Sequence, residues 1–110
     1  MTRNKGTVFC TQLKGRQRFL RLMGDSTKAK GLCSGLVTLR SQEAIGEHVT
    51  ENKEEAIIIL KGSAKIYFGK NKILKARQNS FVFIPPETVH NVENSGKRIL
   101  QYVYITTKIA

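Results

Sequence analysis

The stretch EAIIILKGSAKIYFGKNKILKARQNSFVFI, residues 55–84, indicates the fold class most directly. It holds four short runs rich in Ile, Tyr and Phe, each of the length of a strand. Gly62-Ser63 and Gly69-Lys70-Asn71 separate successive runs, as turn residues do in β-hairpins. The spacing therefore predicts a series of antiparallel strands in this part of the chain.

Similar runs lie on both sides of this stretch. They recur about every eight to ten residues with turn residues between them, which is typical of an all-β sandwich or barrel. Pro85-Pro86 cannot lie inside a central strand and marks a loop or a strand edge. No segment repeats its apolar residues with the period of a helix, so we expect little helix. The further expected strands are residues 8–10, 19–23, 36–39, 44–50, 89–92 and 99–107.

The length of 110 residues fits a single domain. We expect an N-terminal arm with edge strands over residues 1–31 and one continuous barrel over residues 32–107. The longest apolar run is far shorter than the ~20 residues that cross a bilayer, and the N-terminus lacks the apolar stretch of a signal peptide. We therefore expect a soluble cytoplasmic protein. Cys10 and Cys33 have neither disulfide-framework nor zinc-site spacing, which favours two buried or half-buried thiols.

The formal net charge of +11 is unevenly distributed along the chain. Five of the eight acidic residues lie within residues 41–60, which also contain one of the two histidines. An acidic segment in a basic shell favours a site for a cation, or for an anionic ligand held by a cation. The alternative is that the lysines only keep the protein soluble. Nucleic-acid binding is disfavoured, because aromatic residues do not alternate with the basic ones along a continuous face.

Three side chains with metal-binding chemistry stand out: His48, Glu55 and His90. His48 and Thr50 are two residues apart on an expected strand, so they share a face. Glu55 opens the next strand, and His90 follows the Pro85-Pro86 loop. Two imidazoles and one carboxylate form the ligand set of a facial metal site that leaves coordination positions open. Two core histidines without a metal are the alternative.

These residues resemble the first motif of the cupins, G-x5-H-x-H-x3,4-E-x6-G. Here it takes the form His48-x-Thr50-x4-Glu55-x6-Gly62. The first histidine, the glutamate and the closing glycine match. The opening glycine falls on Gln42, and Thr50 stands where the second histidine would be.

The second cupin motif, G-x5-P-x-G-x2-H-x3-N, resembles Asn79-x5-Pro85-x-Glu87-x2-His90-x3-Asn94. The proline, the histidine and the asparagine match, whereas Asn79 and Glu87 replace the two glycines. The resemblance covers about residues 32–107 and implies a small antiparallel jelly-roll barrel, in which a divalent metal ion such as Mn, Fe, Ni, Zn or Co is held inside.

Carried over by position, the resemblance makes His48, Glu55 and His90 the metal ligands. Thr50 would bind weakly, through a water molecule or not at all. Asn94 is expected near the pocket. Strand alternation places Ile57 and Ile59 on the inward face beside Glu55, as an apolar pocket wall.

The resemblance leaves two functions open. One is a metal-dependent enzyme of isomerase, epimerase or dioxygenase type that acts on a small polar or anionic substrate. The other is a non-catalytic module that binds a sugar or a small acid at a degenerate or empty metal site. Small cupins are usually homodimers, and we expect the first thirty residues to make that contact. Tyr102 and Tyr104 share one face of the last strand, but the sequence leaves open whether that face lines the pocket.

Overall fold

In the computed structural model, which describes residues 7–24 and 29–109, the chain is built from β-strands alone. The described residues contain no helix, and so none that could cross a membrane. The prediction of an all-β chain is therefore confirmed. The strands are β1 (Phe19–Met23), β2 (Leu32–Leu39), β3 (His48–Val49), β4 (Lys53–Lys61), β5 (Ser63–Phe68), β6 (Lys72–Arg77), β7 (Phe81–Ile84), β8 (Val89–Glu93) and β9 (Leu100–Lys108).

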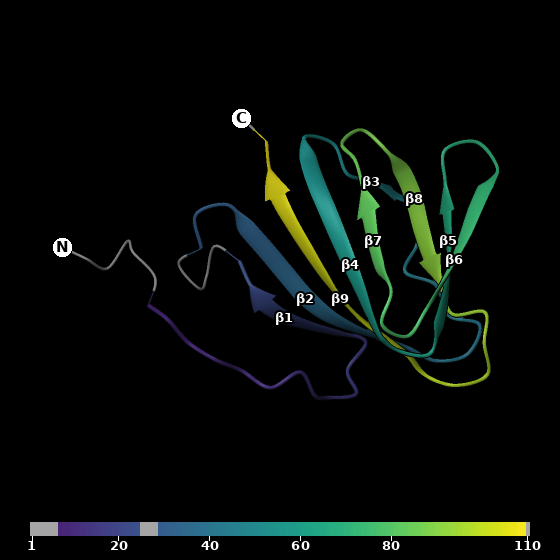
Figure 1. Cartoon of the computed structure of the whole chain (residues 1–110), viewed down its shortest axis with the longest axis horizontal. Coiled ribbons are helices and arrows are strands. Elements are labelled where there is room, and N and C mark those ends of the chain that lie inside the picture. The colour runs from purple at the N-terminus through teal and green to yellow at the C-terminus, as the bar shows by residue number, and fades with distance from the viewer. Residues whose placement is uncertain (1–6, 25–28, 110) are drawn as a thin grey trace.

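The strands form two facing antiparallel sheets with the hydrophobic core between them (Figure 1). The larger sheet has the order β1-β2-β9-β4-β7, and the smaller sheet has the order β3-β8-β5-β6. Consecutive strands often lie in different sheets, so the chain winds between the layers as a jelly roll does. The predicted small antiparallel jelly-roll barrel is thus the observed fold.

Strand alternation decides which side chains face the interior. On β4, Glu55, Ile57 and Ile59 are buried, while Glu54 is exposed. Ile57 pairs with Tyr104 on β9, and Ile59 pairs with Tyr102. Because paired residues point to the same side of a sheet, both tyrosines also face inward. The register thus answers which face of the last strand lines the interior.

Three residues that stand where the cupin motifs have glycine adopt a backbone conformation that glycine favours. Gln42, Asn79 and Glu87 have φ angles of 70°, 70° and 55°, in the left-handed region that glycine adopts most easily. Gly62 keeps its glycine at φ 80°, and a Cβ there would lie 2.5 Å from the carbonyl oxygen of Ile99. At the three positions where the sequence departs from the motif, the backbone therefore has the conformation for which glycine is the least strained residue.

The N-terminal part of the chain is only partly strand. β1 pairs with β2 at the edge of the larger sheet, as expected for residues 19–23. The prediction of a strand at residues 8–10 is wrong. These residues are exposed, and no described strand pairs with them. Residues 1–6 and 25–28 of the expected arm lie outside the described residues.

Candidate metal centre

The structure brings His48, Glu55 and His90 together from three strands. His48 on β3 pairs directly with His90 on β8, and their rings lie 4.1 Å apart between centroids. Glu55 reaches the same point from β4 of the larger sheet, where its Oε1 lies 3.2 Å from His90 Nε2. One possible ligand atom from each of the three residues lies within 4.8 Å of the others. The three candidate ligands named from the sequence therefore converge on one point.

Backbone carbonyls set the same proton position on both imidazoles. His48 Nδ1 lies 2.9 Å from the carbonyl oxygen of Gly46, and His90 Nδ1 lies 3.0 Å from that of Thr88. A carbonyl oxygen only accepts, so we assign the proton of each neutral ring to Nδ1. The lone pair of Nε2 is then free on both rings, as in metal-ligating histidines whose other nitrogen is held by the backbone.

His90 and Glu55 form a buried acceptor pair. His90 is 1% exposed and Glu55 is 8% exposed, whereas His48 lies at the surface. Although Glu55 lies close by, the buried Nε2 of His90 makes no hydrogen bond with any described residue. Leaving such an atom unpaired costs about 1–3 kcal/mol, and a cation bound between Nε2 and the carboxylate would remove that cost. The donor set therefore fits a metal ion.

The same surroundings shift the pKa of His90. Burial alone lowers it, because the charged ring loses its hydration. The Glu55 carboxylate and the Thr88 carbonyl favour the charged form and outweigh burial, so the net effect is a raised pKa. A positive charge at this nitrogen is thus stabilised, whether a proton or a metal ion brings it.

Thr50 stands where the first motif has its second histidine, and its side chain forms hydrogen bonds with backbone groups. Its hydroxyl donates to the carbonyl oxygen of Pro85 at 2.7 Å and accepts the N–H of Thr88 at 3.0 Å. These bonds tie the chain after β3 to the loop before His90. The hydroxyl proton and one lone pair are therefore occupied, which leaves three side chains as the candidate ligands.

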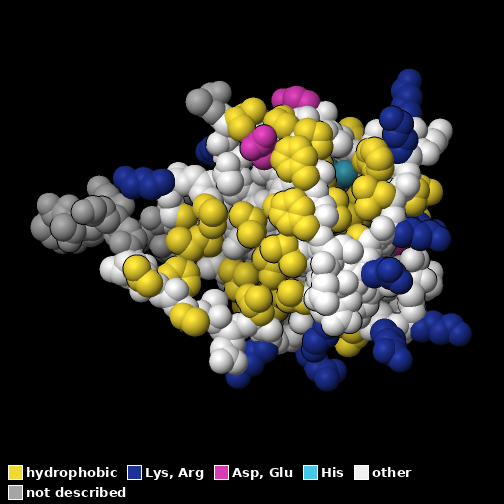
Figure 2. Space-filling view, viewed as in Figure 1, with side chains coloured by type: hydrophobic (Ala, Val, Ile, Leu, Met, Phe, Trp, Pro, Cys, Tyr) yellow, Lys and Arg dark blue, Asp and Glu magenta, His cyan; other side chains and the backbone are white. Residues whose placement is uncertain are grey.

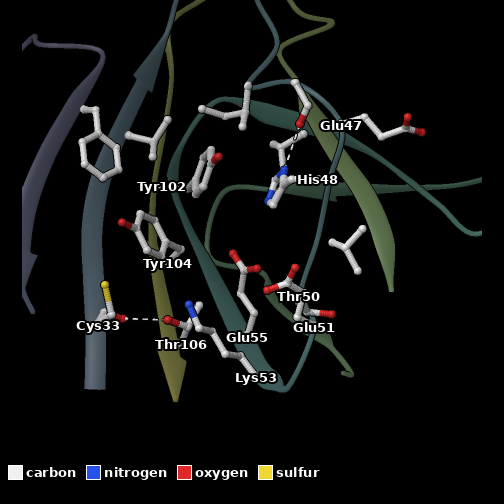
Figure 3. A pocket seen from close by; sticks show the side chains of 16 residues that line it. Cys33, Glu47, His48, Thr50, Glu51, Lys53, Glu55, Tyr102, Tyr104 and Thr106 are labelled. Carbon is white, nitrogen blue, oxygen red and sulfur yellow. Dashed lines mark hydrogen bonds between the residues drawn. The ribbon is translucent and has the colours of Figure 1, made fainter. Parts of the chain in front are cut away.

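A cavity of about 450 Å³ opens beside this group. Figure 3 shows Glu55 and Tyr102 directed into it from the larger sheet, across from His48. Lys53, two residues before Glu55 on β4, also lines it and is half-buried. The remaining lining residues are Phe19, Cys33, Val37, Ile45, Gly46, Glu47, Val49, Thr50, Glu51, Val92, Tyr104 and Thr106.

The two cavity tyrosines stay protonated. Burial raises the pKa of Tyr102, and the negative charge of Glu55 raises it further. Burial also raises the pKa of Tyr104. Both phenols therefore keep their protons and do not serve as bases near neutral pH.

The residues expected as pocket wall lie elsewhere. Ile57 and Ile59 share the inward face with Glu55, but they are fully buried in the core and do not line the cavity. Asn94 is also fully buried and away from the cavity: its amide nitrogen donates to the carbonyls of Leu39 and Arg98, and its Oδ1 accepts the N–H of Gly96.

Two cavity residues, Lys53 and Cys33, were not predicted from the sequence. Lys53 could have been found, because its spacing of two from Glu55 puts both on one face of β4. Cys33 is half-buried and free, as predicted, but Cys10 is exposed rather than buried.

Comparison with known proteins defines the family. The sequence profile of the cupin domain matches residues 35–106, and the chain belongs to this family. No curated protein sequence matches the chain.

Solved structures share the fold at low sequence identity. A cupin-family protein from Methanocaldococcus jannaschii with a double-stranded β-helix fold has a TM-score of 0.78 and 14% identity, and the match covers 94% of this chain and 92% of that one. A cupin 2 conserved barrel protein from Salinispora arenicola has a TM-score of 0.73 and 21% identity, and the match covers 88% of this chain and 80% of that one. The cupin domain of Cnp3 from Schizosaccharomyces pombe has a TM-score of 0.74 and 13% identity. That match covers 83% of this chain but only 64% of the other.

Proposed function

We propose that this cupin domain binds one divalent metal ion through Nε2 of His48, Nε2 of His90 and the carboxylate of Glu55. The observation that carries the proposal is the buried Nε2 of His90, which has a free lone pair, no hydrogen bond and a carboxylate oxygen 3.2 Å away. Neutral imidazole and carboxylate suit transition metals such as Mn, Fe, Ni, Zn or Co.

We propose that the domain is an enzyme of isomerase, epimerase or dioxygenase type for a small polar or anionic substrate. A bound metal ion would act as a Lewis acid or, as Fe(II), supply dioxygen chemistry. The protein contributes the substrate site: Lys53 offers a positive charge, and Tyr102 and Tyr104 offer O–H donors. Apolar residues such as Val37 and Ile45 exclude water from the cavity wall.

Cobalt binding tests the metal site. Protein stripped with a chelator should take up one equivalent of Co(II), gain visible ligand-field absorption and melt several degrees higher. Glu55→Gln and His90→Gln should lose both signals, because each removes a buried ligand. Glu54→Gln is the matched control, since Glu54 is the exposed neighbour of Glu55 on the same strand.

Two results would contradict the metal site: absence of Co(II) uptake by the wild type, or equal losses in Glu54→Gln and Glu55→Gln. Stripped protein that ignores Co(II) but binds a small acid such as pyruvate with one-to-one stoichiometry would instead support the non-catalytic module.

We also propose a homodimer formed through the outer face of the larger sheet. Figure 2 shows apolar side chains across the middle of this view, with Lys and Arg around its right and lower margins. On β7, Phe81 is 67% exposed and Phe83 is 53% exposed, and they pair with Ile58 and Ala56 of β4. Large exposed apolar patches of this kind mark protein contacts.

Sedimentation tests the dimer. The wild type should sediment at twice the chain mass of 12.4 kDa, and Phe81→Glu should shift it toward the monomer. Ile73→Glu on β6 is the control, because Ile73 is also about half exposed but lies on the smaller sheet. A wild-type monomer would contradict this interface.

A cytoplasmic location is proposed as well, in agreement with two free cysteines.

A further inference from the structure

A second cavity, of about 670 Å³, lies between β7 of the larger sheet and β5 and β6 of the smaller one. β7 is the end strand of the larger sheet and β6 is the end strand of the smaller one, and no ladder joins them. Apolar side chains from both sheets line the cavity: Ile66, Phe68, Leu74, Val82 and Ile84. It shares no lining residue with the cavity beside the candidate metal centre.

The mouth of this second cavity is basic. Lys70 and Lys72 belong to its lining, and neither forms an ion pair with any other described residue. Lys72 shares the inward face of β6 with Leu74, whereas Lys75 points to the opposite face. Glu87 is the single carboxylate among the lining residues, so the lining carries a net positive charge.

An apolar interior with cationic groups at its mouth fits a ligand with an apolar body and one anionic head. The volume lies in the range of ordinary ligand pockets, which bury most of a bound small molecule. We propose that this cavity is a second binding site, which takes a medium-chain monocarboxylate with its chain between the sheets and its carboxylate against Lys70 and Lys72. The proposal is independent of the metal site, because the two cavities have separate walls.

Three probes of the same chain length separate the charge from the apolar contribution: decanoate, decanol and decyltrimethylammonium. By calorimetry, decanoate should bind about tenfold more tightly than decanol, since each rim lysine contributes about threefold. The cationic probe should bind most weakly. Lys72→Gln should reduce decanoate affinity about threefold and leave decanol affinity unchanged, whereas Lys75→Gln on the opposite face should change neither.

Methyl NMR locates the bound chain. Decanoate should shift the methyl signals of Ile66, Leu74 and Val82, and it should leave those of Val37 and Ile45 beside the metal centre unchanged. Shifts at Val37 and Ile45 instead would overturn the proposal, and so would equal affinity for decanoate and decanol. Binding that weakens as protein concentration rises would mean that a second copy of the chain fills the cavity, which also overturns it.

Discussion

The two histidines of the candidate metal centre sit directly opposite each other on neighbouring strands, in contrasting surroundings. His48 lies on β3, a two-residue strand at the end of the smaller sheet, and is exposed. His90 lies on β8, which has a partner strand on each side, and is buried. In both histidines, Nδ1 contacts the carbonyl oxygen of the residue two positions earlier, which orients the ring.

The comparison separates orientation from rigidity. A carbonyl at position i−2 orients either ring, whatever the strand around it. Rigidity comes from neighbours: His90 is enclosed by β3, β5 and Glu55, whereas within residues 7–24 and 29–109 no strand pairs with the other side of β3. We infer that His90 and Glu55 form the fixed half of the candidate site and that His48 is the candidate ligand able to adjust its position.

The largest expected difference is in metal affinity. His90→Gln should weaken Co(II) binding about 1000-fold, or about 4 kcal/mol, because it removes a buried ligand that water cannot replace. His48→Gln should weaken it about 100-fold, or about 3 kcal/mol, because water can take the exposed position. Competition with a coloured chelator measures both constants. Equal losses, or a larger loss in His48→Gln, would show that the burial contrast does not control affinity.

The next effect concerns the residues that hold the two histidine strands. Asn94, just beyond β8, is fully buried and its side chain makes three hydrogen bonds to backbone groups, so Asn94→Ala should lower the free energy of unfolding by about 3 kcal/mol. Asn91 makes one exposed bond, in which its Oδ1 accepts the N–H of Gly46 before β3. Asn91→Ala should cost less than about 1 kcal/mol. Urea unfolding of the metal-free protein compares them, and similar losses would refute the contrast.

The strands and the three candidate ligands could be predicted because their signals are local. Alternation of apolar and polar residues marks a strand within a few positions, and motif spacing fixes Glu55 and His90 by sequence distance alone. At the turns, Gln42, Asn79 and Glu87 have the left-handed backbone angles that a glycine at these motif positions would adopt most easily.

The cavity lining could not be predicted in the same way, because it depends on register and depth. Tyr102 and Tyr104 were assigned to a face only by the pairing of β9 with β4. Ile57 and Ile59 face inward as expected, but they are covered by the other residues of the core. The sequence of a single strand does not show how deeply an inward side chain is buried. The hydroxyl of Thr50 bonds to a loop 35 residues away, which spacing does not show.

The third effect concerns how stability depends on pH. The contribution of His90 in the metal-free protein and the stabilisation by bound metal should change in opposite directions with pH. The pKa of His90 is raised in the folded state, so in the metal-free protein its contribution to stability is full below its ordinary pKa of about 6.5 and is lost as pH rises through the raised pKa. Protons also compete with Co(II) for Nε2, so the stabilisation by metal should shrink as pH falls.

Melting curves between about pH 5 and pH 8 test this sign, with a slope of at most about 1.4 kcal/mol per pH unit for one proton. The curves with and without Co(II) should approach each other at the acidic end. His90→Gln should remove the acid-side gain of the metal-free protein. A metal stabilisation that grows toward low pH would contradict the assignment of Nε2 as a ligand.

The smallest effect compares the turns of the two motif segments. Gln42 before β3 and Glu87 before β8 hold left-handed backbone angles that cost a side-chain-bearing residue about 1–2 kcal/mol. Glycine relieves that strain but adds about 0.4–1 kcal/mol of freedom to the unfolded chain, so Gln42→Gly and Glu87→Gly should each stabilise the fold by about 0.5 kcal/mol. Gln78→Gly, at an exposed position outside the left-handed region, should destabilise it instead. If Glu87→Gly instead lowers the melting temperature as Gln78→Gly does, contacts of the Glu87 side chain stabilise the left-handed φ angle, and the angle is not a source of strain.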